Sequence, residues 1–283
     1  MKEVYLNGSY VPRDQATLDI EDRGAMFADG VYEVVHYFSG RAFAMEEHLK
    51  RLERSMAAID LVEPRARELG VISDQLIKRN SLDDATVYWQ VTRGSARRDH
   101  VIHAETKPTI LAIAYEAAPL DIAAEPISVH ATLTKDLRWH QCAIKSLMLL
   151  PNVLAKSAAH RAGAFEAILH RQGLVTEGSS TNIFVVCDGE LRTHEANEMI
   201  LGGITRDIVI QLARDSGIAC HEQAVTVDQL LAAQEVMLTG TTTLVAAVSR
   251  VDDSDIAGGH IGPITTRLHR LLIDHIAKVC GIS

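Results

Sequence analysis

Several segments in the first third of the chain alternate between apolar and polar residues with a period of two, as half-buried β-strands do. Residues 4–11 hold two apolar runs around Asn7 and Gly8, a pair that favours the type I′ turn of a tight hairpin. Residues 30–45 repeat the arrangement around a second glycine-containing turn. The pattern therefore predicts two β-hairpins in this region.

A period close to 3.6 residues marks other segments. Residues 45–59 place Leu49 and Met56 on one face of a helix. Residues 151–163 have a helix-forming composition and end at a glycine. Residues 202–217 carry an apolar stripe, begin with two glycines and end at a third. We expect a helix in each of these three segments.

Most of the remaining apolar runs are short and rich in β-branched or aromatic residues, which favours strands. They lie in residues 85–94, 109–115, 165–193 and 235–251. These runs outnumber the strands of a regular βαβ alternation, so the predicted fold class is α+β.

A candidate linker lies near the middle of the chain. Residues 116–126 contain two prolines, no clear periodicity and few bulky apolar side chains. We therefore predict a small N-terminal domain of residues 1–118, a linker of residues 119–126 and a larger C-terminal domain of residues 127–283. A chain of 283 residues is long enough for two such domains.

Composition and charge narrow the function classes. A hydrophobic fraction of 47% and a charged fraction of 23% are typical of a globular protein, and the net charge of −9 argues against nucleic-acid or membrane partners. The N-terminus lacks a signal-peptide pattern, and the four cysteines form no CxxC pair, so a reduced, cytoplasmic chain is expected. His100 and His103 have a metal-like spacing but no apparent third ligand, so no metal site is expected.

One lysine stands in an unusual place. Lys145 lies between Ile144 and the apolar run of residues 147–150. Its stem could simply pack there while its ammonium group extends to water. Alternatively, desolvation favours the neutral amine, which is the form that attacks a carbonyl carbon to make a Schiff base. The position alone leaves both interpretations open.

Three other segments offer complementary chemistry. GGITRD, residues 202–207, places the backbone N–H groups of Ile204 and Thr205 at the start of a predicted helix, where anions bind. TGTTT, residues 239–243, is a second hydroxyl-rich loop. Glu177, in TEGSSTNIF, is an acid at the entry of a predicted strand. Each of these is a weak signal when taken singly.

Together and in this order, these segments resemble the fold-type IV pyridoxal phosphate enzymes, and among them the D-amino acid aminotransferases. The resemblance covers roughly residues 18–250. The motifs that carry it are EDRGAMFADGVYEVV, EEHLKRL, VTRGSARRDH, AIKSLMLLPNVLAK, FEAILHRQGLVTEGSSTNIF, ILGGITRD and TGTTT. The resemblance implies ping-pong transamination of D-amino acids, such as D-alanine with 2-oxoglutarate to give pyruvate and D-glutamate.

The resemblance also implies roles for particular residues. Lys145 is the lysine that forms the internal aldimine with pyridoxal 5′-phosphate, and Glu177 is the partner of the pyridine nitrogen. The residues implied to hold the phosphate are Arg51, Ile204, Thr205 and Thr241. Without the resemblance, Arg51 could form an ordinary surface ion pair with Glu47, four residues earlier on the predicted helix.

The stretch RGSARRDH, residues 93–100, bears on the substrate. By the same resemblance, Arg98 and His100 grip the substrate carboxylate together with Tyr32, across the interface of a homodimer. A guanidinium suits this role because it offers two parallel hydrogen bonds to a carboxylate. A solvated basic turn is the alternative interpretation, since arginines cluster here.

Other activities share the fold type and stay open as alternatives. They are branched-chain L-aminotransferase, (R)-amine transaminase and aminodeoxychorismate lyase. A non-enzymatic pyridoxal phosphate carrier would need Lys145 but neither Arg98 nor His100. Two positions depart from the family pattern: Arg97 stands where proline is frequent, and Ala143 replaces a more polar residue. The sequence does not specify the preferred D-amino acid.

Overall fold

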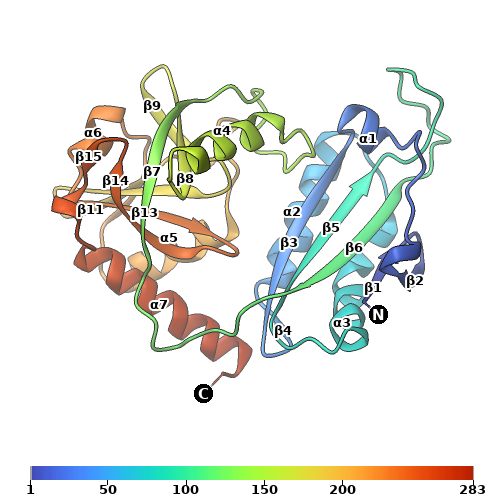
Figure 1. The fold of residues 1–283 in the computed structure, drawn as a ribbon, viewed down its shortest axis with the longest axis horizontal. Helices are drawn as coiled ribbons and strands as arrows, with labels where there is room; N and C mark the ends of the chain where they lie inside the picture. The colour runs from blue at the N-terminus through green and yellow to red at the C-terminus, as the bar shows by residue number, and fades with distance from the viewer. Residues whose placement is uncertain (1, 283) are drawn as a thin grey trace. The chain divides into compact units, whose positions relative to one another are not determined.

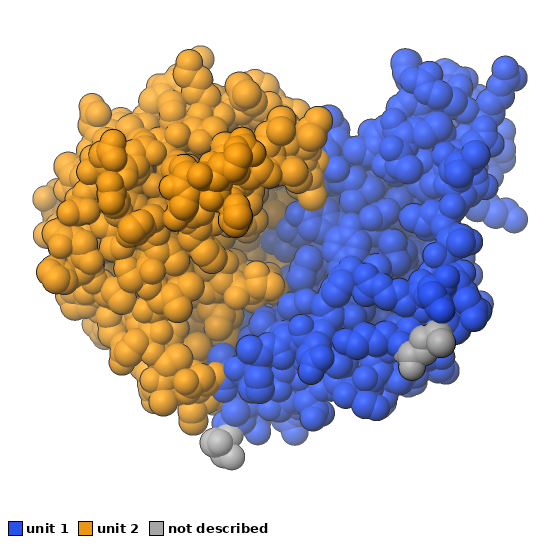
Figure 2. Space-filling model, viewed as in Figure 1, with its two compact units in different colours: residues 1–120, 144–148, 279–282 blue, residues 121–143, 149–278, 283 orange. Residues whose placement is uncertain are grey.

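The computed structural model describes residues 2–282 (Figure 1). Their α-carbon contacts group them into two compact units, which Figure 2 colours separately. Unit 1 comprises the chain up to Leu120 with Ile144–Met148 and Val279–Ile282, and unit 2 comprises Asp121–Ala143 and Leu149–Lys278. Lys145 is therefore grouped with unit 1. The domain boundaries expected from the sequence stay a prediction.

Unit 1 is built on an antiparallel sheet of six strands in the order β2-β1-β6-β5-β3-β4. The turn between β1 and β2 has positive φ at Asn7 (47°) and Gly8 (98°), as a type I′ turn requires. β3 and β4 form the second hairpin, so both hairpin predictions are confirmed. The strands are β1 (Glu3–Leu6), β2 (Ser9–Pro12), β3 (Gly30–Phe38), β4 (Arg41–Ala42), β5 (Ala85–Thr92) and β6 (Thr109–Glu116).

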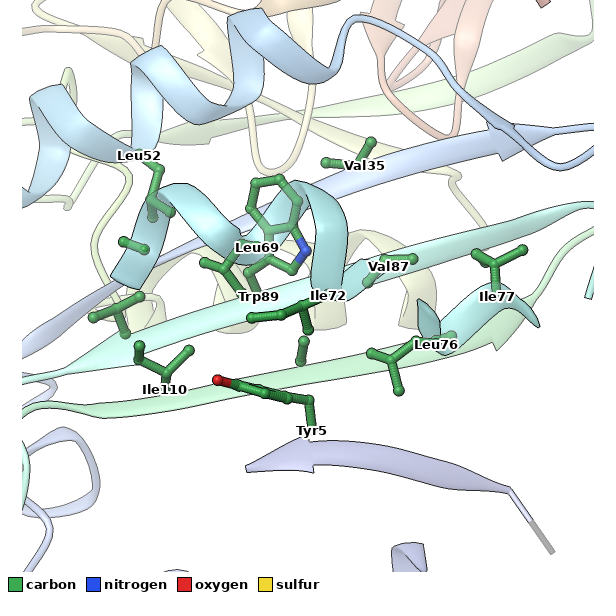
Figure 3. Packing of buried hydrophobic residues seen from close by; sticks show 14 of the residues in the cluster. Tyr5, Val35, Leu52, Leu69, Ile72, Leu76, Ile77, Val87, Trp89 and Ile110 are labelled. Atoms are coloured by element: carbon green, nitrogen blue, oxygen red, sulfur yellow. The ribbon is translucent and has the colours of Figure 1, made fainter. Parts of the chain in front are cut away.

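Helices α2 (Met45–Ala58) and α3 (Leu69–Arg79) pack against this sheet. Their apolar side chains and those of the strands form one buried cluster, in which Leu52 of α2 and Trp89 of β5 are fully enclosed (Figure 3). The indole N–H of Trp89 donates to the Oγ of Ser73 over 2.7 Å, which satisfies a buried donor. The short helix α1 (Arg23–Phe27) precedes β3.

Unit 2 contains a nine-stranded mixed sheet in the order β12-β11-β10-β13-β14-β7-β8-β9, with β15 paired to β14. The pairs β14–β7, β7–β8 and β11–β12 are parallel. The strands are β7 (Ser128–Lys135), β8 (Glu166–Arg171), β9 (Leu174–Gly178), β10 (Asn182–Cys187), β11 (Glu190–Thr193), β12 (Cys220–Glu222), β13 (Glu235–Gly240), β14 (Leu244–Val251) and β15 (Ser254–Asp255).

The helices of unit 2 lie outside its sheet. α4 approaches β8 closely because Ala155 and Ala159 present small side chains to Ala167 and Leu169. α5 packs near β13 and β12. The helices are α4 (Leu150–Arg161), α5 (Ile204–Asp215), α6 (Val227–Leu231) and α7 (Pro263–Cys280). The last two residues of α7 are grouped with unit 1.

The α+β class is confirmed, as are the helices expected in residues 45–59, 151–163 and 202–217, which correspond to α2, α4 and α5. Helices α3 and α7 and strand β7 were not predicted. Among residues 2–282, no helix is both long and apolar enough to cross a membrane.

Candidate active site

Lys145 lies on a short extended segment that continues the unit 1 sheet at the open edge of β3. Tyr32 donates its backbone N–H to the Lys145 carbonyl over 3.0 Å, and Leu147 donates to Gly30 over 3.0 Å. The Lys145 N–H donates to the Oγ of Ser55 on α2 over 3.1 Å. These three bonds fix the lysine backbone, so the position of the side chain is set by the sheet and by α2.

The amine of Lys145 meets an aromatic ring. Its Nζ lies 4.4 Å from the centre of the Tyr32 ring. The Lys145 side chain is half-buried, and no carboxylate among the described residues of unit 1 forms an ion pair with it. The amine is therefore not engaged by a carboxylate and is available to form a bond with a carbonyl carbon.

Strand alternation sends the neighbours Tyr32 and Glu33 to opposite faces of the sheet. Glu33 faces α2 and is fully buried. Its carboxylate accepts hydrogen bonds from Arg51 Nε over 2.7 Å and Arg51 Nη2 over 2.9 Å, and the Nδ1 of His48 lies 2.7 Å from it. Arg51 is only 5% exposed, so it does not form the surface ion pair with Glu47 that the sequence left open.

The charges of this buried cluster are well defined. Burial acts to raise the pKa of Glu33, but the Arg51 guanidinium and the hydrogen bonds from Arg51 and His48 outweigh it and hold the pKa far below its ordinary value. Burial lowers the pKa of His48 despite the nearby Glu33 carboxylate. Glu33 is therefore ionised beside a charged Arg51 and a neutral His48, and it fixes the orientation of Arg51.

Arg98 and His100 lie on the loop between β5 and β6, and both side chains are exposed. Phe27 of α1 brings them together. The Arg98 guanidinium carbon lies 5.4 Å from the centre of the Phe27 ring, and the His100 ring meets the same ring edge-on at 5.5 Å. The structure thus gathers the two residues expected to bind a carboxylate around one aromatic side chain.

In unit 2, Glu177 lies at the end of β9 and is buried. Its carboxylate accepts hydrogen bonds from Arg138 Nη1, from Asn182 Nδ2 over 3.0 Å and from the Leu201 N–H over 3.0 Å. Arg138 is also paired with Asp136 at 2.8 Å. Burial raises the pKa of Glu177, and the Arg138 guanidinium opposes that effect. Arg138 and the Leu201 N–H favour the ionised form of Glu177, but burial outweighs them, and the pKa of Glu177 lies above its ordinary value.

The start of α5 lies beside Glu177, because Asn182 contacts both. Besides its bond to Glu177, the Asn182 amide donates to the Leu201 carbonyl over 2.9 Å. A Cβ added at Gly203 would come within 1.9 Å of the Asn182 Oδ1, so only glycine fits there. Ile204 and Thr205 follow as buried residues of the first turn of α5, where backbone N–H groups lack intrahelical acceptors.

The loop between β13 and β14 connects two strands of the sheet that also contains β9 and β10. Asn182 is the cross-strand partner of Thr239 on β13, and Thr241 follows two residues later, half-buried. The Oγ1 of Thr239 is buried and has no hydrogen-bond partner within residues 2–282. An unpaired buried hydroxyl is suited to an additional polar ligand.

Several residues of these clusters were not identified from the sequence, among them Ser55, Glu33, Arg138 and Asn182. A signal existed for Glu33, since an acid among the apolar residues of a predicted strand must be paired if it is buried. For Arg138 and Asn182, only the folded chain shows that they converge on Glu177.

Comparisons with known proteins agree with this chemistry. A family model described as Amino-transferase class IV matches residues 30–251. The D-alanine aminotransferase of Listeria monocytogenes serotype 1/2a (strain 10403S) is 41% identical over 282 residues, covering 99% of this chain and 98% of the relative. The D-alanine aminotransferase of Bacillus licheniformis is also 41% identical, covering 98% of this chain and 99% of the relative.

Solved structures give the same family. A branched-chain amino acid aminotransferase from T.th., solved with pyridoxamine 5′-phosphate, has a TM-score of 0.89 at 27% identity, covering 99% of this chain and 95% of that chain. The branched-chain amino acid aminotransferase of Escherichia coli has a TM-score of 0.86 at 25% identity, covering 100% and 95%. The chain therefore belongs to the class IV aminotransferases. Within that family, the two D-alanine aminotransferases are similar to it at higher identity than these two branched-chain enzymes.

Proposed function

We propose that the chain is a pyridoxal phosphate-dependent aminotransferase that moves the amino group of D-alanine to 2-oxoglutarate, giving pyruvate and D-glutamate. The observation that carries the proposal is the unpaired Lys145 amine beside Tyr32, in a chain similar over its whole length to D-alanine aminotransferases. Branched-chain L-amino acids are the second candidate, because the structural neighbours include branched-chain enzymes.

The residues present fit this cofactor. Lys145 offers an amine for covalent attachment, and the first turn of α5 offers N–H groups for a phosphate. Thr239, the cross-strand partner of Asn182, offers a buried hydroxyl without a hydrogen-bond partner among residues 2–282. We assign phosphate binding to Arg51, Ile204, Thr205 and Thr241. The Arg51 guanidinium, which Glu33 orients, carries a positive charge that stabilises a phosphate dianion. The N-terminus of α5 does the same through its free N–H groups and the helix dipole.

The reaction then divides among residues of the chain. Pyridoxal phosphate, when bound, supplies an electron-withdrawing ring and carries the amino group from donor to acceptor. Lys145 would hold it covalently through Nζ, and the freed amine would take the proton from the Cα of the donor as a general base and deliver it, as a general acid, to the C4′ carbon of the cofactor. The Glu177 carboxylate, which accepts a hydrogen bond from Arg138, would hold a proton on the ring nitrogen.

Substrate choice is assigned to Tyr32, Arg98 and His100, which would bind the α-carboxylate. Arg98 and His100 are exposed in the protomer, and by family resemblance they serve the site of the partner subunit, so we propose a homodimer. Binding the carboxylate at a fixed point lets one enantiomer present its Cα–H to Lys145. The relatives named D-alanine aminotransferase make D the expected hand.

Arg98→Leu tests the carboxylate assignment. We expect kcat/KM for D-alanine to fall. The loss should correspond to about 2–5 kcal/mol of transition-state stabilisation, the cost typical of removing one partner of a hydrogen-bonded charge pair. The half-reaction with D-alaninol, which has no carboxylate, should change little. The measurement is kcat/KM for both donors, with L-valine and L-leucine as further donors. An equal loss for D-alanine and D-alaninol would refute the assignment, and preference for L-leucine would move the chain to the branched-chain class.

A further inference from the structure

The segment before β3 belongs to the motif EDRGAMFADG, which so far has no role in the site. Asp22 caps α1: its carboxylate accepts from the Gly24 N–H over 2.8 Å and from the Thr92 Oγ1 over 3.0 Å. Asp22 and Arg23 are 1% and 4% exposed. Two consecutive charged residues this deeply buried need specific partners.

Arg23 has one carboxylate partner and two carbonyl partners, and the two carbonyls lie at the ends of the tripeptide of residues 99–101. Its Nε donates to Asp29 Oδ2 over 2.8 Å. Its Nη1 donates to the carbonyl of Asp99 over 2.6 Å and reaches the carbonyl of Val101 at 3.4 Å. These two carbonyls flank His100. Arg23 therefore clamps the backbone of the loop at the position of a proposed carboxylate-binding residue.

Phe27 contacts the side chains of the same loop. Its ring lies 4.9 Å from the guanidinium carbon of Arg23 and 5.4 Å from that of Arg98, and the His100 ring meets it edge-on at an angle of 72°. A cation over an aromatic ring is attracted by the ring quadrupole. Phe27 thus links the buried clamp to both exposed residues.

The carboxylate of Asp29 anchors the clamp. Besides Arg23, Asp29 accepts from the Nε of Arg93 at 2.9 and 3.0 Å. Arg93 is itself held by the carbonyls of Asp60 and Ile59. From Gly94 to Pro108 the loop contains no helix and no strand longer than an isolated bridge, so it has little backbone structure of its own to orient Arg98 and His100.

We propose that Arg23 and Phe27 are positioning residues that hold Arg98 and His100 in the geometry that binds the substrate carboxylate. The proposal rests on the carboxylate role assigned to those two residues above. Ordering an exposed loop costs conformational entropy, and contacts made before the substrate arrives remove that cost from binding. Their loss is expected mainly in the KM for a carboxylate donor.

The test uses the holoenzyme and four variants. Phe27→Leu keeps an apolar side chain but removes the ring, whereas Phe27→Tyr keeps the ring. Arg23→Leu removes the clamp. Arg79→Leu is the matched control, because Arg79 also pairs with a carboxylate, Glu3 at 3.0 Å, and lies over an aromatic ring, Tyr10 at 4.3 Å, in the same unit.

We expect Phe27→Leu and Arg23→Leu to raise KM for D-alanine roughly tenfold, as loss of one or two modest interactions would. kcat, and the half-reaction with D-alaninol, should stay within about twofold. Phe27→Tyr and Arg79→Leu should resemble the parent protein. Amide hydrogen exchange in peptides covering residues 95–103 should be faster in Phe27→Leu and in Arg23→Leu than in the parent protein. Phe27→Tyr and Arg79→Leu should not change it.

An unchanged KM for D-alanine in Phe27→Leu would overturn the proposal, as would a loss of equal size for D-alaninol. Phe27→Leu leaves every hydrogen bond of Arg23 in place, so it remains informative if Arg23→Leu does not fold. Arg98→Leu is measured in parallel. If Arg98→Leu lowers kcat/KM for D-alanine and the Phe27 variants do not, only the positioning role fails; if Arg98→Leu has no effect, the carboxylate assignment itself fails.

Discussion

Replacing Lys145 with alanine should reduce amino-group transfer from D-alanine by roughly 10²–10⁴-fold or more, the range that a general acid–base contributes. The same variant should lose the covalent linkage to pyridoxal phosphate that borohydride reduces in the parent protein. The reason is that Lys145 alone is assigned both the attachment of the cofactor and the movement of the Cα proton. Activity and the absorbance of the borohydride-treated protein measure the two effects.

Lys50→Ala is the control for this experiment. Lys50 lies on α2 in the same unit, is exposed and pairs with Glu46 at 3.6 Å, so its loss should leave both measurements unchanged. Mass spectrometry of peptides from the reduced parent protein should locate the modification on Lys145. A modified peptide centred on any other lysine would contradict the assignment.

Replacing Glu177 with glutamine should lower kcat by roughly 10²–10³-fold, the range typical of removing one electrostatic stabiliser of the transition state. A neutral amide cannot hold a positive ring nitrogen as a carboxylate does. Its single carbonyl oxygen can accept from Asn182 or from the Leu201 N–H but not from both, because these two groups donate to different oxygens of Glu177. The cofactor should still bind, so the protein should remain yellow while turnover slows.

A buried carboxylate elsewhere in unit 2 provides the comparison for Glu177. Glu235 is 5% exposed and accepts from the N–H groups of Ile264 over 3.0 Å and Thr265 over 2.7 Å. Glu235→Gln should lower the free energy of unfolding without lowering kcat in the folded enzyme. Unchanged turnover in Glu177→Gln would show that another group faces the ring nitrogen.

Local patterns predicted much of the secondary structure, because they depend on near neighbours. Asn7 and Gly8 adopt the positive φ angles that make their hairpin tight, and the apolar spacing of α2 buries Leu52 against the sheet. α7 carries the same kind of signal in Leu268, Leu272 and Ile276, all buried, although no helix was predicted there. β7 is harder to predict, because its parallel pairing with β14 joins residues far apart in the chain.

The candidate site also contains features that the sequence predicts and features that only the folded chain shows. The roles of Lys145 and Glu177 came from family resemblance rather than from spacing, and the structure adds the groups that set their surroundings. Alternation along β3 was sufficient to place Tyr32 and its neighbour Glu33 on opposite faces. No local pattern predicts that Arg23 reaches the carbonyls of residues 99 and 101, because such a contact depends on the register of β3 with β5.

Chiral analysis of one reaction product tests the central claim most directly. The parent protein is incubated with D-alanine, 2-oxoglutarate and pyridoxal phosphate, and the glutamate formed is resolved into its enantiomers. Binding of the carboxylate by Tyr32, Arg98 and His100 predicts that a single enantiomer is formed, and the similarity to D-alanine aminotransferases predicts that it is D-glutamate. No comparable product is expected from L-alanine or L-leucine. Formation of L-glutamate from L-leucine, or of pyruvate without any glutamate, would contradict the proposed function.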